Sequence, residues 1–347
     1  MTTHYRVIFP VGQGGFAFEN IGTTSIVYDC GSISSPARLE MYIDCLKAHD
    51  IKQIDYLFIS HFDIDHVNGI QYLLSSGIKV VNAVMSAIPK DLRIVYNAAT
   101  DGAYLAMRQL LKQNECEILE INEETQQKKI SESNQLWEWI AKSMLSSSDL
   151  QNLRQELLNN SIDIKLLKNT EYLEQQKVDI NNAFKTVFGP LGPNSKGLIV
   201  LSQKTQNAQM DSTCLDHIYS YSLCRLCHPL CHEHRYFVSS LHYTSCLYTG
   251  DTRIKTQKEI QTITDFLQRY RYEQALSIMQ LPHHGSKYNI HNELHKHIIA
   301  DLYYVHDNTD KRIKQSQPLY ADLKTNHSLH VVKDRCADII FGVTHIH

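Results

Sequence analysis

Four side chains that can bind a metal ion fall within six residues of this chain. His61, Asp63, Asp65 and His66 directly follow an apolar run at residues 55–60, and residues 67–69 open a predicted helix. Imidazole nitrogens and carboxylate oxygens are common ligands of divalent cations. The pattern therefore predicts a tight ligand loop at the carboxyl end of a buried strand. Such a loop can hold a pair of cations, and paired cations activate water for hydrolysis.

Two later apolar runs end in the same way. Residues 245–249 run into Gly250 and Asp251, and residues 275–281 run into Pro282, His283 and His284. Loops that follow strand ends gather the chemistry of α/β folds. We therefore expect Asp251, His283 and His284 to join the ligand loop in space.

Length and composition set the class of protein. The 347 residues suffice for one large domain or two ordinary ones, and 43% of them are hydrophobic. A net charge of −3 does not indicate a strongly basic nucleic-acid-binding domain. No apolar stretch reaches the roughly 18 residues that span a bilayer, and the amino terminus lacks a signal peptide's apolar core. The sequence therefore predicts a cytoplasmic protein without a membrane segment.

Strand and helix patterns predict a single domain over residues 1–347 that carries a helical insertion. Residues 91–180 are rich in Gln, Asn, Glu, Lys and Leu, and helical spacing occurs around 102–114, 133–145 and 149–159. We interpret this insertion as a helical cap on the domain. The alternatives are a lid or a surface for a protein partner or a second copy of the chain. Predicted strands span residues 5–9, 24–29, 55–60, 79–85, 184–188, 197–202, 235–241, 245–249, 275–281, 301–305, 329–332 and 338–343.

A Cys/His-rich stretch at residues 203–234 predicts a second insertion. In a chain without a signal peptide, its cysteines are expected to be thiols or metal ligands rather than a disulfide framework. CxxC spacing fits one half of a structural zinc site, while the second half is compressed. The alternative is a loop without metal. The candidate ligands are Cys214, Cys224, Cys227, Cys231 and His234.

Several sequence blocks, in order along the chain, carry a resemblance to a known family. They are Val11-Gly12-Gln13-Gly14, Ile26-Val27-Tyr28-Asp29-Cys30-Gly31, His61-x-Asp63-x-Asp65-His66, the run from Asn194 to Leu201, Tyr248-Thr249-Gly250-Asp251 and Pro282-His283-His284-Gly285-Ser286. Together they resemble the metallo-β-lactamase superfamily. Within it, they resemble the hydrolase domain of the competence DNA-uptake channel family. The resemblance covers roughly residues 5–85, 184–202 and 236–345 and leaves out both insertions.

The resemblance implies a fold and a set of ligands. The fold is α/β, a four-layer αββα sandwich with a dinuclear metal site on one edge. His61 and Asp63 correspond to ligands of the first metal, and Asp65 and His66 to ligands of the second. Asp251 corresponds to the carboxylate that bridges both metals. One histidine of the His283-His284 pair completes the second site; we favour His283 as this ligand and His284 as a substrate or transition-state contact.

Two departures from the superfamily pattern bear on the metal. Asp63 stands where the common loop has a histidine. The middle histidine that usually completes the first site has no clear counterpart, and Asn194 occupies the corresponding neighbourhood. Oxygen ligands favour harder cations such as manganese or magnesium over zinc. We therefore expect two divalent cations, zinc or manganese.

The resemblance implies a hydrolase of the phosphodiesterase or nuclease type, with Asp65 and Asp251 orienting the water or accepting its proton. Nucleic acid is the first expected substrate, and a small nucleotide or a phosphocholine-type ester is the second. Two alternatives belong to other classes. One is a di-iron redox enzyme, although no flavin or dinucleotide motif is visible; the other is a non-catalytic module that keeps the fold for partner recognition.

Overall fold

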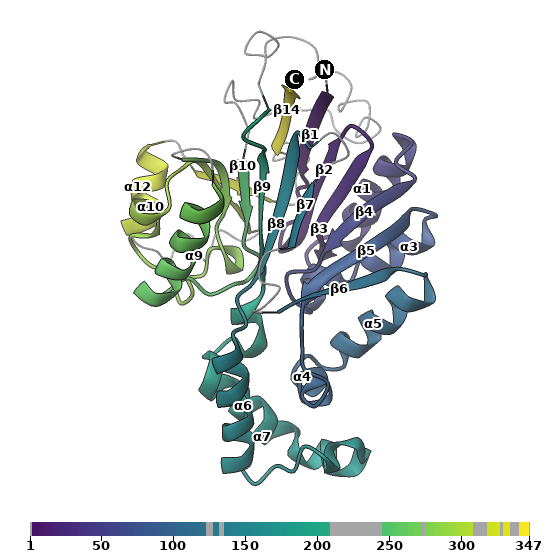
Figure 1. Ribbon diagram of the computed structural model, residues 1–347, viewed down its shortest axis with the longest axis vertical. Coiled ribbons are helices and arrows are strands. Elements are labelled where there is room, and N and C mark those ends of the chain that lie inside the picture. Colours follow the sequence, from purple (N-terminus) through teal and green to yellow (C-terminus); the bar gives the residue numbers. More distant parts are fainter. Residues whose placement is uncertain are drawn as a thin grey trace.

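The computed structural model describes residues 2–122, 128–131, 135–208, 245–271, 275–307, 318–326, 329–333 and 340–346. Within these residues, two seven-stranded sheets pack face to face, with helices on their outer faces (Figure 1). This arrangement confirms the predicted four-layer αββα sandwich. The predicted zinc ligands between Cys214 and His234, and the predicted strand at 235–241, lie outside the described residues.

In the first sheet, the strand that leads into the ligand loop, β4, lies near the centre. The outer face of this sheet is covered by α1 (Pro36–Ala48), α3 (Ile70–Ser75), α4 (Arg93–Ala99) and α5 (Ala103–Gln113). The strands from β3 to β6 run parallel, whereas β1 and β2 are antiparallel to their neighbours. In order, the strands are β14 (Ile340–Ile346), β1 (Thr2–Ile8), β2 (Gly14–Ile21), β3 (Thr24–Ser32), β4 (Gln53–Phe58), β5 (Lys79–Ser86) and β6 (Glu117–Ile121).

The second sheet carries the later site loops. Its outer face is covered by α9 (Gln257–Tyr270), α10 (Leu294–His297) and α12 (Pro318–Thr325). The strands from β10 to β13 run parallel, so their carboxyl ends meet at one edge. In order, the strands are β13 (Leu329–Val332), β12 (Ala300–His306), β11 (Leu276–Gln280), β10 (Ser245–Tyr248), β9 (Leu198–Lys204), β8 (Trp137–Ser143) and β7 (Lys128–Ser131).

Alternation along the strands divides the core into three layers. In β9, Leu198 and Val200 pack between the sheets, whereas Ile199 and Leu201 pack against the outer helices of the second sheet. This is the two-residue period of a strand whose faces are both buried. Because both faces need apolar side chains, such strands read as continuous apolar runs. For this reason, β4, β9, β10 and β11 could be predicted from apolar runs in the sequence.

A buried polar cluster ties the two sheets together. Glu19, on β2, accepts hydrogen bonds from Arg6 Nε at 2.7 Å and from Tyr248 Oη at 2.6 Å through one carboxylate oxygen. Its other oxygen accepts from Trp139 Nε1 at 2.8 Å and from Ser202 Oγ at 2.6 Å. Arg6 and Glu19 belong to the first sheet, whereas the other three residues belong to the second. A buried charge pair with satisfied hydrogen bonds therefore fixes how the sheets face each other.

The same cluster makes stability depend on pH. Burial lowers the pKa of His4 to about 4, even though its contact with Glu19 acts in the opposite direction. His4 is therefore neutral in the folded protein and takes up a proton on unfolding once the pH falls below 6.5. We expect the free energy of unfolding of metal-free protein to decrease as the pH falls from 6.5 towards 4. In denaturant unfolding, the free energy of unfolding of His4→Gln should change less steeply with pH than that of the wild type. The difference in slope should correspond to one proton, about 1.4 kcal/mol per pH unit. An unchanged slope would contradict this.

Residues 91–180 differ from the predicted helical insertion. The predicted helix around 133–145 is wrong, because Trp137–Ser143 forms β8, which pairs with β9 inside the second sheet. The predicted strand at 184–188 is also wrong, since it is the last turn of α7 (Thr170–Phe188). Tertiary contacts determine whether each of these segments is a helix or a strand, because a short apolar run is compatible with both.

Besides α4 and α5, this range contains a helical hairpin. It consists of α6 (Ser147–Asn159) and α7, which project together away from the sheets (Figure 1). Ser146 caps α6 and forms a capping box with Asp149. Leu158, Leu166 and Val178 are exposed on the hairpin. Its role as a lid or as a surface for a partner stays a prediction.

Candidate metal centre

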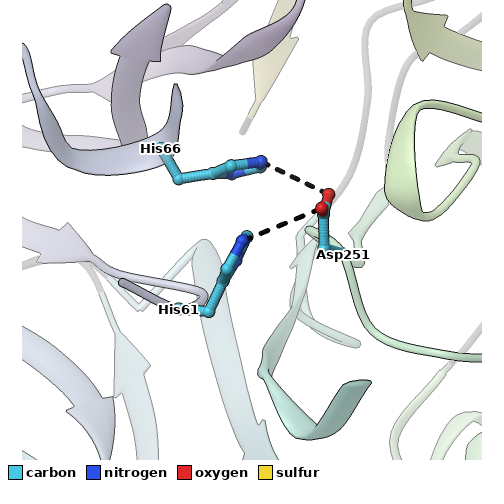
Figure 2. A group of neighbouring side chains, drawn as sticks. All are labelled: His61, His66 and Asp251. Atoms are coloured by element: carbon cyan, nitrogen blue, oxygen red, sulfur yellow. Dashed lines mark ion pairs between the residues drawn. The ribbon is translucent and has the colours of Figure 1, made fainter. Parts of the chain in front are cut away.

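The ligand loop and the two later loops meet at one edge of the sandwich. His61 and His66 follow β4 and point towards Asp251, which follows β10 in the opposite sheet (Figure 2). The Nε2 atom of His61 lies 3.8 Å from Asp251 Oδ2, and the Nε2 atom of His66 lies 3.3 Å from Asp251 Oδ1. All three side chains are buried. Asp251 lies 190 positions after His61 in the sequence, and the fold nevertheless places its carboxylate beside both imidazoles.

A second compact group shares His66. Ligand atoms of Asp65, His66 and His284 lie within 4.8 Å of one another. The Nε2 atom of His284 lies 3.1 Å from Asp65 Oδ2 and 3.7 Å from Asp251 Oδ1. These side chains are also buried. Asp251 therefore lies between two overlapping groups of nitrogen and oxygen ligands.

The free atoms of this cluster fit divalent cations. The Nε2 atoms of His61 and His66 are buried and have no hydrogen-bond partner. Leaving such atoms without partners in a protein interior costs free energy. A cation held between them and the carboxylates of Asp251 and Asp65 would satisfy these atoms and compensate the negative charge.

Hydrogen bonds behind the imidazoles fix which nitrogen faces the site. Ser60 Oγ lies 2.7 Å from Asp29 Oδ2 and 2.8 Å from His61 Nδ1. Because an ionised carboxylate can only accept, Ser60 donates to Asp29 and accepts from the Nδ1–H of His61. His66 Nδ1 lies 2.7 Å from the same Asp29 oxygen and donates to it as well. Both Nε2 atoms therefore present lone pairs to the centre, as metal ligands require.

His284 is oriented in the same manner from the opposite sheet. Its Nδ1 atom lies 3.0 Å from the backbone carbonyl oxygen of His306, at the end of β12, and donates to it. The Nε2 atom then faces the carboxylates of Asp65 and Asp251. Neighbouring strand ends thus orient each imidazole of the two compact groups.

Asp29 is expected to control metal affinity although it lies outside the ligand groups. Its φ of 52° is left-handed, a conformation that asparagine adopts readily. Asp29→Asn keeps this shape but places an amide group where two N–H or O–H donors need an acceptor. We expect about 10–100-fold weaker cation binding, measured by competition with a chromogenic chelator. Asp55→Asn is the matched control, because Asp55 lies on β4, the strand that leads into the ligand loop. Equal cation affinities of the two variants would contradict the role of Asp29.

Electrostatics keep the carboxylate of Asp251 ionised. Burial alone would raise the pKa of Asp251, but His284, His283 and His66 outweigh it and hold this pKa well below the usual range. Conversely, burial alone would lower the pKa of His66, but Asp251 and Asp29 raise it well above the usual range. Without a cation, these shifts favour a protonated His66 beside an ionised Asp251. Cation binding displaces this proton, as is general for histidine ligands.

The remaining predicted ligands lie at the rim. Asp63 has 42% of its side chain exposed and lies 3.8 Å from His61 Nε2. His283 faces Asp251, with its Nδ1 atom 2.8 Å from Oδ2, and 17% of its side chain is exposed. The geometry thus places His284, rather than His283, with Asp65 and His66. Both histidines have left-handed backbones, with φ of 49° and 50°, which turns adjacent side chains towards one site.

The glycine-rich loop of residues 11–15 packs directly against the ligand loop. A Cβ atom at Gly15 would lie 2.9 Å from His66 Nδ1, and one at Gly14 would lie 2.9 Å from the carbonyl oxygen of Asp65. These positions therefore require glycine for close approach. Gln13 Nε2 lies 3.5 Å from Asp65 Oδ2 at the same place. Ser60 and His306, by contrast, carried no sequence signal beyond their positions at strand ends.

Comparison with known proteins bears on the amino-terminal part of the centre. Residues 17–89 match the family model described as the metallo-beta-lactamase superfamily. The matched region contains Asp29 and the whole ligand loop, and it supports the superfamily read from the sequence blocks. A search of curated proteins found no match. The comparisons do not confirm the narrower resemblance to the competence DNA-uptake family.

Solved structures are similar at low identity. The metallo-beta-lactamase fold protein YhfI from Bacillus subtilis matches 98% of this chain and 100% of its own, with 10% identity and a TM-score of 0.46. A diphosphatase from the PhnP family matches 99% of each chain, with 8% identity and a TM-score of 0.43. The long form of RNase Z from yeast matches 81% of this chain and 32% of its own, with 8% identity and a TM-score of 0.34. Within the part of the chain that the structure describes, no helix is long and apolar enough to cross a membrane.

Proposed function

We propose that this protein is a metal-dependent hydrolase that holds two divalent cations and cleaves a phosphodiester. The observation that carries the proposal is the position of Asp251. Its Oδ2 atom faces His61 at 3.8 Å, and its Oδ1 atom faces His66 at 3.3 Å and His284 at 3.7 Å. One carboxylate thus presents its two oxygens to different sets of ligands. A carboxylate placed in this way would be able to hold two divalent cations at once, one at each oxygen.

The two sites can be defined by their residues. The first site comprises His61, Asp63 and the Oδ2 atom of Asp251. The second site comprises Asp65, His66, His284 and the Oδ1 atom of Asp251. The second set has all its side chains buried, whereas the first opens to solvent at Asp63. We therefore expect substrate to reach the centre from the Asp63 side.

The chain's own residues orient the reaction. The cations, when bound, supply Lewis-acid activation of a water molecule and neutralise charge that develops on a phosphoryl oxygen. Asp65 Oδ2 and Asp251 can accept hydrogen bonds from that water and hold it in line with the substrate. Asp29, Ser60 and the His306 carbonyl group keep the imidazoles fixed during the reaction.

A phosphodiester is the proposed substrate because of the sequence blocks. The blocks from Val11 to Ser286 resemble the hydrolase domain of the competence family, which implies a nuclease-like activity. Two cations beside an open rim also suit a substrate that carries negative charge. Nucleic acid is therefore the first substrate to test, followed by small nucleotides and phosphocholine-type esters.

Hydrolysis of bis-p-nitrophenyl phosphate tests the proposal. Wild-type protein reconstituted with manganese or zinc is expected to hydrolyse it, and Asp65→Ala is expected to be at least about 100-fold slower. Asp179→Ala, which removes an exposed carboxylate on α7, serves as the control. DNA is then offered to the same three proteins. Equal rates for Asp65→Ala and the wild type would remove Asp65 from the site, and rates no higher than metal alone would contradict the proposed function.

A further inference from the structure

Asn194 lies beside the first site although it is far from the ligand loop in sequence. Its Nδ2 atom is 2.5 Å from Asp63 Oδ2, across 131 residues of chain. It lies on the short 3-10 helix η2 (Gly192–Lys196), between α7 and β9. The neighbouring Ser195 stabilises this turn, because its Oγ lies 2.9 Å from the carbonyl oxygens of both Phe188 and Gly192 and donates its single proton to this pair. The loop after Asp251 holds it from the other side, since Arg253 N donates to Ser195 O at 3.1 Å.

The Asn194 side chain also carries a free acceptor. Its Oδ1 atom is buried and has no hydrogen-bond partner. An asparagine amide can turn by 180° and exchange its oxygen and nitrogen with almost no change in shape. The amide oxygen can therefore take the position beside Asp63 Oδ2, on condition that a cation lies between the two oxygens. The same cation would meet His61 Nε2, which lies 3.8 Å from Asp63 and has no partner either.

We propose that the carboxamide oxygen of Asn194 binds the first cation, together with His61, Asp63 and Asp251. This inference rests on the proposed dinuclear centre and assigns it a further ligand. The first site then has one imidazole and three oxygen ligands. The second site has two imidazoles and two carboxylate oxygens. The two cations are therefore held by unequal ligand sets.

Unequal ligand sets lead to unequal metal preference. Oxygen ligands suit manganese and magnesium, whereas imidazole suits zinc. The first site should therefore prefer manganese over zinc more strongly than the second site does. Replacing Asn194 with histidine exchanges an oxygen ligand for a nitrogen ligand at one position. This variant should shift the first site towards zinc without altering the second site.

Metal titration of purified full-length protein tests the assignment without measuring activity. Metal-free wild type, Asn194→Ala and Asn194→His are titrated with manganese, followed by paramagnetic resonance of free manganese, and with zinc against a chromogenic chelator. Wild type is expected to bind two manganese ions. Asn194→Ala should bind one of them at least about tenfold more weakly, and Asn194→His should raise the zinc-to-manganese preference of one site at least about tenfold. Asn182→Ala, an exposed asparagine on α7, is the control, and thermal melting confirms that each variant is folded.

The outcomes separate a ligand from a residue that only supports Asp63. If Asn194→Ala binds both cations like the wild type, the inference is overturned. It is also overturned if Asn194→Ala weakens binding but Asn194→His leaves the zinc-to-manganese preference unchanged, because Asn194 would then only hold Asp63. If wild type itself binds fewer than two cations, the dinuclear centre fails and this inference fails with it.

Discussion

Asp251→Ala is expected to abolish binding of both cations and to lower phosphodiester hydrolysis at least about a thousandfold. In the proposed centre, removing this side chain takes one oxygen ligand from each site at once. It also leaves His61 and His66 facing each other, with ring centres 4.1 Å apart and no carboxylate between them. No other single substitution in the centre affects both sites as directly.

Metal analysis after reconstitution and gel filtration measures this effect. Wild type and the control Asp179→Ala should retain two cations per chain, whereas Asp251→Ala should retain none. The variant is expected to stay folded, because Asp251 lies in a loop rather than in the sheet core. An Asp251→Ala protein that retains two cations, or that hydrolyses substrate at the wild-type rate, would contradict the bridging role.

Glu19→Gln is expected to have the largest effect on stability. Arg6 is 1% exposed and pairs with Glu19 at 2.7 Å between the sheets. The substitution keeps the shape of Glu19 but leaves the Arg6 charge buried without its counter-ion. Breaking one partner of a buried pair costs about 3–5 kcal/mol. We therefore expect a loss of this size in the free energy of unfolding.

Urea denaturation of the metal-free protein at neutral pH measures the loss. Glu174→Gln, an exposed glutamate on α7, is the control and should lie within about 0.5 kcal/mol of the wild type. The double variant Arg6→Met/Glu19→Gln removes the buried Arg6 charge as well but keeps an amide oxygen that can accept, and it should recover part of the stability. A loss below about 1 kcal/mol in Glu19→Gln would mean that water or another group compensates Arg6.

The ligand loop could be read from the sequence because its signal is local. The apolar run before His61 marks a buried strand, and the ligands follow within a few residues. The runs before Asp251 and His283 gave the same signal, so three loops on two sheets could be predicted to converge. The strand β8 could not be recognised, because Trp137, Trp139 and Ile140 suit a helical face as well as a strand. Its pairing with β9 in the second sheet settled the conformation.

The finer geometry of the site depends on contacts that no local pattern encodes. The choice between His283 and His284 rests on two consecutive left-handed residues and on the carbonyl group of His306 in the next strand. The link from Asp29 through Ser60 to His61 joins the ends of β3 and β4. Each of these contacts forms only after the sheets are assembled. Sequence patterns therefore predicted the residue types at the centre better than their individual roles.

Anomalous diffraction from crystals grown with manganese or zinc tests the dinuclear centre most directly. Two peaks about 3.5–4 Å apart are expected, one on each side of the Asp251 carboxylate. The first should contact His61 and the second should contact His66 and His284. A single peak away from Asp251, or no peak between it and His61, would contradict the dinuclear centre on which the proposed hydrolysis depends.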